Sequence, residues 1–132
     1  MNYLAILVSG VISMAVGAFW YSPAVFGRAW MKLSCFSNKQ IAKAKNKGMG
    51  SSYFAAFIAA LVTSWIFAQI VELTGATTAI AGALVGFAVW LGFFATTLLS
   101  SVLWEQKPVK LYLINIGHYL VVLLITGALL AV

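Results

Sequence analysis

Four apolar stretches, each long enough to cross a lipid bilayer as a helix, set the strongest limit on how this chain can fold. A transmembrane helix needs about 20 consecutive apolar residues. A membrane β-barrel would instead show segments of about ten residues with alternating polarity, and the run 120–125 does not alternate. The sequence therefore predicts an all-α bundle of four transmembrane helices in a single domain, residues 1–132. The predicted spans are residues 3–21, 53–73, 78–103 and 111–132.

The composition also indicates that the chain lies in a lipid bilayer rather than in water. Of the 132 residues, 64% are hydrophobic and only 8% are charged, whereas soluble domains carry about 25% charged residues. A soluble domain of this size would expose large apolar patches to water. The single cysteine, Cys35, excludes an intrachain disulfide and a cysteine-rich metal site.

The basic residues indicate an orientation, because all eight fall in the two connections on one side of the predicted bundle. Cytoplasmic loops are enriched in Lys and Arg. Loops 22–52 and 104–110 are therefore predicted to be cytoplasmic, and both termini to lie outside. The net charge of +6 follows from this topology, and we expect no nucleic-acid partner. The eight residues are Arg28, Lys32, Lys39, Lys43, Lys45, Lys47, Lys107 and Lys110.

Two helix patterns occur in the first predicted loop. Ser22 followed by Pro23 is typical of an N-cap and a first helical position, and the next residues predict a short amphipathic helix in the headgroup plane. A capping box at residues 37–40, with Gly48 as a stop, predicts a second, basic helix. We expect this loop to bind anionic lipid headgroups, and docking of another protein is the alternative. The first helix has an apolar face of Val25, Phe26, Ala29, Trp30 and Leu33, and a basic face of Arg28 and Lys32.

The fourth predicted span carries two candidate functional residues, Asn115 and His118. Three residues apart on a helix, they can face a common partner, and they lie at a depth comparable with Thr96 and Thr97 of the third span. This spacing predicts a polar cluster between the two helices. His118 is either a neutral imidazole bonded to a neighbouring helix or a proton relay or a metal or haem ligand. No cofactor is expected, since one histidine does not complete a metal site.

A second polar pair, Gln69 and Glu72, lies near the outer end of the second span. A buried Glu72 would indicate ion or proton handling, whereas an interfacial one would be uninformative. The Thr74-Gly75 turn follows at once, which favours the interfacial position.

Small residues recur at four-residue spacing on two spans and predict close helix packing, within the protomer or between protomers. We therefore expect a homo-oligomer or an association with other membrane helices. The packing candidates are Ser9, Ser13 and Gly17 on the first span, and Gly82, Gly86 and Gly92 on the third.

Aromatic residues cluster at the predicted cytoplasmic boundary, as aromatic belts do. Trp65 and Trp90 lie deeper, where packing is the ordinary explanation. The boundary residues are Trp20, Tyr21, Trp30, Trp104 and Tyr112.

Several blocks of sequence occur in a recognisable order. They are Trp20-Tyr21-Ser22-Pro23, Phe26-Gly27, Trp30-Met31-Lys32-Leu33, Ala95-Thr96-Thr97-Leu98-Leu99 and Ile114-Asn115-Ile116-Gly117-His118. With these blocks the chain resembles a family of small bacterial membrane proteins known only as a domain of unknown function. The resemblance implies a bacterial inner-membrane protein of about four helices, and it brings no catalytic residue, substrate or cofactor.

The sequence shows no paired nucleophile and base and no phosphate-binding glycine loop, so it gives no positive evidence for an enzyme. The favoured function is a helix-packing accessory or lipid-interacting membrane protein. An oligomeric transporter or channel for small molecules or ions, with a polar path near Asn115 and His118, is the alternative. A membrane enzyme or redox protein that uses His118 is a third possibility.

Overall fold

The computed structural model describes residues 2–34, 39–40, 42–43 and 50–132, and every regular secondary-structure element among these residues is a helix. Four helices are long and apolar enough to span a membrane, which confirms the predicted all-α membrane fold. The observed boundaries differ from the predicted ones by at most three residues, at the start of the second span. The spans are α1, Tyr3–Trp20; α4, Gly50–Thr74; the third span, Ala79–Leu103; and α8, Val109–Ala131.

The third span is not a uniform α-helix. It consists of α5 (Ala79–Val89), a π-helical turn η1 (Trp90–Ala95), and the short helices α6 (Thr96–Leu98) and α7 (Ser100–Leu103). A π-helical turn inserts one extra residue per turn and often lies at a functional position. The sequence pattern did not predict this interruption.

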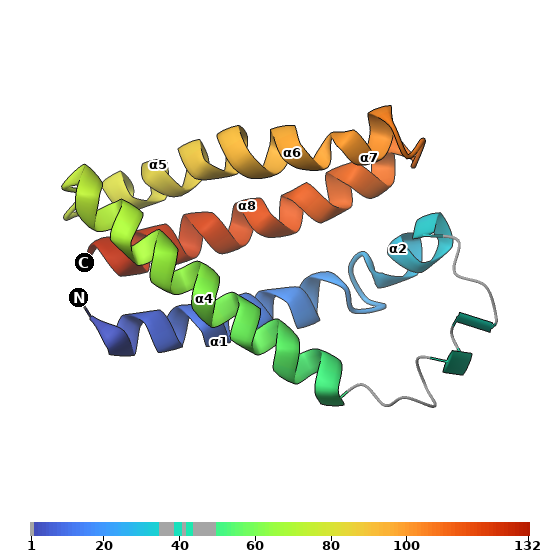
Figure 1. The fold of residues 1–132 in the computed structure, drawn as a ribbon, viewed down its shortest axis with the longest axis horizontal. Coiled ribbons are helices and arrows are strands. Elements are labelled where there is room, and N and C mark those ends of the chain that lie inside the picture. Colours follow the sequence, from blue (N-terminus) through green and yellow to red (C-terminus); the bar gives the residue numbers. More distant parts are fainter. Residues whose placement is uncertain (1, 35–38, 41, 44–49) are drawn as a thin grey trace.

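Helix α8 is the centre of the bundle (Figure 1). Helix α5 packs along one side of α8, and α1 and α4 pack on the other side, where α4 crosses α1 obliquely. Both chain termini lie at one end, which we call the terminal end. The opposite end carries residues 18–34 and 100–112, and we call it the basic end.

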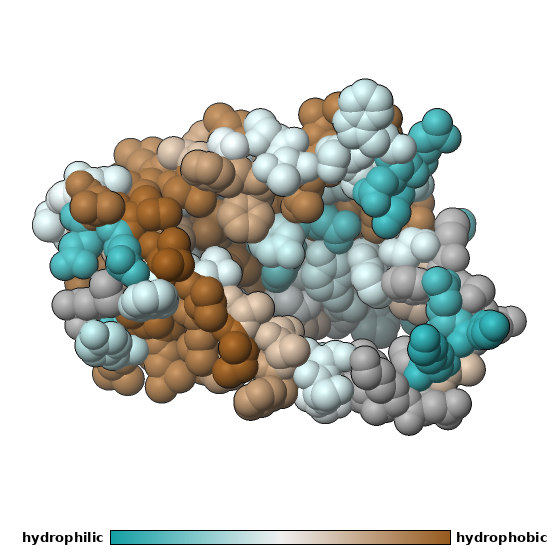
Figure 2. Space-filling model, viewed as in Figure 1, coloured by the Kyte–Doolittle hydropathy of each residue, from teal (hydrophilic) through white to brown (hydrophobic). Residues whose placement is uncertain are grey.

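Most of the apolar surface points outward rather than into a core. Between 17% and 33% of the most apolar part of each span is buried, and the largest share belongs to α8. The fully enclosed core is small and centres on Phe67, Val71 and Leu123. Figure 2 shows hydrophobic residues over the body of the molecule and hydrophilic residues mostly at its two ends. This is the surface of a multi-pass membrane protein, whose outer side chains face lipid tails.

Close backbone contact joins α5 to α8 near the terminal end. A Cβ atom at Gly82 would collide with the carbonyl oxygen of Gly127, and one at Gly86 would collide with the carbonyl oxygen of Leu123. Lipid tails are as apolar as the side chains, so helices in a bilayer associate through such close packing rather than through hydrophobic burial. Glycine is required at both positions because no side chain fits there.

The short helix after α1 begins later than the sequence predicted. Residues 21–26 form turns, and α2 spans Gly27–Ser34. The prediction of Ser22 as its N-cap was wrong, because the Ser22 hydroxyl donates to the Phe19 carbonyl, 2.7 Å away, and so completes the end of α1. Gly27 packs directly on the Tyr21 carbonyl oxygen. The capping box of residues 37–40 and the stop at Gly48 lie largely outside the described residues.

Candidate functional site

A cluster of polar and aromatic side chains lies around α8 in the half of the bundle toward the basic end. Two residues at the end of α1 bond to it. The Trp20 indole Nε1 donates to the Ile114 carbonyl oxygen at 2.9 Å, and the Tyr21 hydroxyl donates to Oδ1 of Asn115 at 2.8 Å. Trp and Tyr carry an apolar ring with one polar group that needs a partner when buried. Both partners here lie on α8, so these two bonds fasten the end of α1 to it.

The third span is fastened to α8 in the same way at both ends of η1. The Trp90 indole Nε1, at the start of η1, donates to the Ile116 carbonyl oxygen at 2.8 Å. The Tyr112 hydroxyl of α8 donates to the carbonyl oxygen of Ala95, the last residue of η1. Helix α8 is therefore hydrogen-bonded to both ends of the π-helical turn.

His118 of α8 faces α1. Its ring is 5.4 Å from that of Tyr21 and 5.0 Å from that of Tyr119, measured between centroids. A Cβ atom added at Gly17 would lie 3.3 Å from Nε2 of His118. Both ring nitrogens are inaccessible to solvent, and neither has a hydrogen-bond partner among the described residues.

Of the four residues predicted to form a polar cluster, the structure brings Asn115 and His118 together with a shared neighbour, Tyr21. The other two lie apart from them. Thr96 and Thr97 are exposed on the third span, and the Thr96 hydroxyl donates to the Gly92 carbonyl of its own helix at 2.7 Å. The partner of Asn115 and His118 is therefore the end of α1 rather than the third span.

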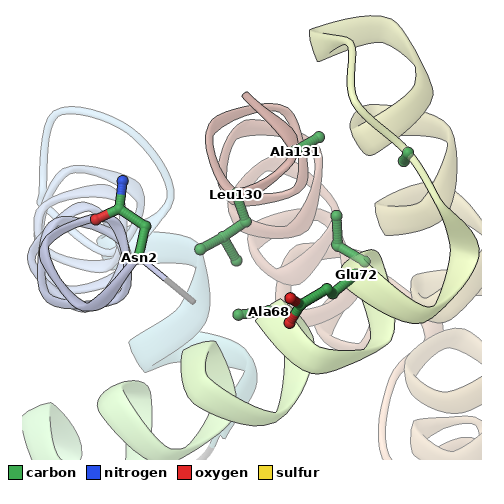
Figure 3. Close-up of a pocket in the computed structure, with 7 residues that line it drawn as sticks. Asn2, Ala68, Glu72, Leu130 and Ala131 are labelled. Carbon is green, nitrogen blue, oxygen red and sulfur yellow. The ribbon is translucent and has the colours of Figure 1, made fainter.

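The two residues of the second predicted pair, Gln69 and Glu72, differ in exposure. Gln69 is half-buried, whereas Glu72 is exposed and lines a pocket of about 180 Å³ at the terminal end. Figure 3 shows its carboxylate extending from α4 toward the space beside Ala68 and Leu130. Among the lining residues, Glu72 alone has an ionisable side chain. Its lining residues are Asn2, Ala68, Val71, Glu72, Ala76, Leu130 and Ala131.

The predicted packing residues occupy different environments. Ser9 is completely buried, Gly17 meets His118, and Gly82 and Gly86 meet the α8 backbone. Ser13 is half-buried, and its hydroxyl donates to the Ser9 carbonyl at 2.9 Å. By contrast, Gly92 is exposed, and a Cβ atom there would meet nothing within 4 Å. Gly127, the counterpart of Gly82, was not singled out from the sequence.

The sequence did not reveal that four side chains of the cluster donate hydrogen bonds to other helices. Their signal was the residue type itself, because a Trp N–H or Tyr O–H inside a membrane requires an acceptor. The sequence pattern indicated an aromatic belt and two deeper packing residues, Trp65 and Trp90. Three of the four acceptors are backbone carbonyls, which no residue type reveals. The four donors are Trp20, Tyr21, Trp90 and Tyr112.

The cluster offers limited chemistry. Its titratable side chains are one imidazole and several phenols, and the only two carboxylates of the chain, Glu72 and Glu105, lie in the terminal-end pocket and in the exposed connection before α8. Among the described residues, no group of three or more His, Cys, Asp or Glu side chains is placed to hold a metal ion. The arrangement is suited to hydrogen bonding at His118 and to fastening helices.

Comparison with known families gives one match, which covers nearly the whole chain. The model of a family described as protein of unknown function (DUF1761) matches residues 4–131. No curated protein and no solved structure matches the chain.

Proposed function

The chain belongs to the DUF1761 family of proteins of unknown function, and from its own geometry we propose that it is an accessory membrane protein that binds anionic lipid headgroups at its basic end. The observation that carries this proposal is that α2 exposes two basic side chains, Arg28 and Lys32, one turn apart. Cationic side chains near an anionic bilayer surface contribute about 1 kcal/mol each.

The opposite face of α2 fixes its orientation. Trp30 and Leu33 of α2 are half-buried, as is Phe26 in the turn just before it, and α2 contacts α8. The Trp30 ring meets that of Tyr21 edge-on, with centroids 5.5 Å apart, and the Phe26 ring lies 4.8 Å from that of Trp20. These contacts support a helix that lies at the end of the bundle and turns its basic side outward.

The rest of the basic end adds charge of the same sign. Lys107 and Lys110 are exposed in the connection before α8 and at its start, and Glu105 is the one carboxylate in this region. By the preference of basic loops for the cytoplasm, we place this end on the cytoplasmic side and both termini outside, in a bacterial inner membrane. A cysteine at Ser51 in a Cys35→Ser background should then be shielded from impermeant thiol reagents in intact cells, whereas one at Thr77 should be labelled.

The lipid proposal is tested by the lipid that the protein retains. Protein extracted from bilayers of equal phosphatidylglycerol and phosphatidylcholine should keep phosphatidylglycerol preferentially, measured by native mass spectrometry. Removing both α2 charges with Arg28→Gln and Lys32→Gln should reduce this preference about 30-fold at low salt, since about 1 kcal/mol is lost for each residue.

The matched control is the pair Lys107→Gln and Lys110→Gln, which changes the net charge equally but leaves α2 intact. It should have a clearly smaller effect. Equal effects of the two pairs would show that general surface charge attracts the lipid and that α2 has no special part. Unchanged lipid retention in both would show the proposal to be wrong.

A second candidate function is transport of protons or small ions along a path at Asn115 and His118. One observation favours it: both ring nitrogens of His118 are buried with no hydrogen-bond partner among the described residues, and an ionisable side chain inside a membrane marks a candidate path for protons or ions. Proton flux into vesicles that contain the protein, compared with vesicles that contain a His118→Phe variant, tests this candidate. Equal flux in the two would exclude it.

A further inference from the structure

The pocket at the terminal end lies beside the last turns of two helices and has a volume of about 180 Å³. Glu72 belongs to the last turn of α4, and Leu130 and Ala131 belong to the last turn of α8. Figure 3 shows Asn2 on one side of this space and the Glu72 carboxylate on the other, with Leu130 between them. The pocket therefore has a polar group at each of two edges and an apolar wall between them.

The charges around the pocket favour a cation. The carbonyl ends of α4 and α8 both border it, and the C-terminus of a helix carries a partial negative charge. Glu72 is exposed, and its carboxylate adds a full negative charge when it is ionised. Among the described residues, no lysine or arginine lines the pocket, and neither helix has a basic residue in its last turn. A cation that enters the pocket would therefore meet negative charge from two helix ends and one side chain.

The other lining groups indicate the kind of cation. Ca²⁺ takes about six to eight oxygen ligands, whereas only Glu72 and Asn2 among the described lining residues have oxygen in their side chains. An alkylammonium group instead combines N–H donors with a hydrocarbon stem. The stem would lie against Ala68 and Val71, which are buried and apolar. The lining therefore suits an organic ammonium ion better than a metal ion.

Asn2 supplies the second polar edge. Its Oδ1 accepts a hydrogen bond from the Ala5 backbone N–H at 3.1 Å and so caps the N-terminus of α1. The amide NH₂ group of the same side chain can donate to a ligand oxygen. A ligand that fits both edges has an ammonium group at one end, a short hydrocarbon stem and an oxygen at the other end.

We propose that this pocket binds an aminoethyl group of the ethanolamine type, with Glu72 as the counter-ion of its ammonium group. The volume is that of about six water molecules at about 30 Å³ each, which is sufficient for such a group. Because Glu72 lies in the last turn of a membrane span, the pocket is at the level of lipid headgroups. Phosphatidylethanolamine and free ethanolamine both carry this group. The site lies at the end of the bundle opposite α2, so it does not depend on the lipid-binding proposal for the basic end.

The lipid source is tested by lipid retention. Wild-type protein extracted from bilayers of equal phosphatidylethanolamine and phosphatidylcholine should keep phosphatidylethanolamine preferentially, measured by native mass spectrometry. Glu72→Gln keeps the size of the side chain and removes its charge, and should reduce this preference about tenfold. Glu105→Gln is the matched control, because it removes the only other carboxylate side chain of the protein, and it should leave the preference unchanged.

The soluble source is tested by NMR with ¹³C-labelled glutamate, which gives two carboxylate signals from the two glutamates of the chain. In nanodiscs of phosphatidylcholine alone, ethanolamine hydrochloride should shift the Glu72 signal and leave the Glu105 signal in place. The Glu72→Gln variant assigns the two signals. An equal concentration of choline chloride, whose nitrogen has no N–H donor, is the control for charge and salt and should shift the Glu72 signal less.

The outcomes separate the two sources. Lipid preference without a response to ethanolamine would support the site and assign it to a headgroup, and the reverse result would support the site and assign it to a soluble amine. Equal retention of the two lipids together with an unmoved Glu72 signal in the wild type would overturn the proposal without any variant. Equal shifts with ethanolamine and choline, or equal losses in the two glutamine variants, would also overturn it, because general attraction of cations would then explain the binding.

Discussion

The two halves of α8 are held to their neighbours by different forces. Toward the terminal end, Gly82 and Gly86 let the backbone of α5 touch that of α8. Toward the basic end, contact is made by side chains that donate hydrogen bonds, such as Trp20 and Trp90 to α8 carbonyls. The first half is therefore held by close backbone packing, and the second by hydrogen bonds from side chains to the α8 backbone.

The difference follows from the surrounding solvent. In a bilayer, neither half gains from removing apolar surface from water. Helices are then joined either by close backbone approach or by polar groups that would otherwise be unsatisfied in hydrocarbon. Helix α8 is joined to its neighbours in both ways. The same kind of substitution should therefore change stability by very different amounts at different points along its contacts.

The largest effect is expected from Gly82→Ala. The added Cβ atom meets the Gly127 carbonyl oxygen, and the backbone of α5 has to move away, which should destabilise the fold by about 3 kcal/mol. Unfolding in mixed detergent micelles with increasing dodecyl sulfate measures this loss. Gly92→Ala, on the same span but in open space, should change stability by less than about 0.5 kcal/mol. Equal losses would break the comparison, because stability would then not depend on close packing near the terminal end.

An intermediate effect is expected for the bond between Tyr21 and Asn115. The variants Tyr21→Phe and Asn115→Leu, alone and combined, form a double-mutant cycle that isolates this bond. Hydrogen bonds between membrane helices couple by about 0.6 kcal/mol on average, up to about 1.7 kcal/mol, and we expect a value in that range. Stability is measured by the same unfolding experiment. A coupling of zero would show that the basic half is held by packing of rings rather than by polar bonds.

The sequence predicted the spans well because their signal is local. Each apolar run is limited by residues that lipid does not accept, and Pro108, which stands at the N-cap of α8, and Gly75, with φ of +75°, mark two of the connections. The largest boundary difference arises at Gly50, where two serines that follow it continue the helix. Serine disfavours helix interiors only weakly, so its presence did not end the span.

The site was predicted less well because its partners come from distant parts of the chain. Asn115 and His118 share Tyr21 as a neighbour, whereas depth alone suggested Thr96 and Thr97 as their counterparts. Depth gives the level of a residue in the membrane and not its direction around the helix axis. The π-helical turn is a further case, because Trp90 and Tyr112 fix its ends through bonds to another helix, which no pattern within the third span reveals.

The smallest effect is expected from Thr96→Val, and it tests which helices share the polar half. The Thr96 hydroxyl is bonded to the Gly92 carbonyl of its own helix and is exposed, so its removal should change the free energy of unfolding by less than about 0.5 kcal/mol. The near-equal volume of valine avoids a cavity. A loss above about 1 kcal/mol in the detergent unfolding experiment would mean that Thr96 bonds to another helix. The third span would then contribute its own polar side chains to the contacts of α8 toward the basic end. The contrast between a half of α8 held by close backbone packing and a half held by hydrogen bonds with the end of α1 and with η1 would then be wrong.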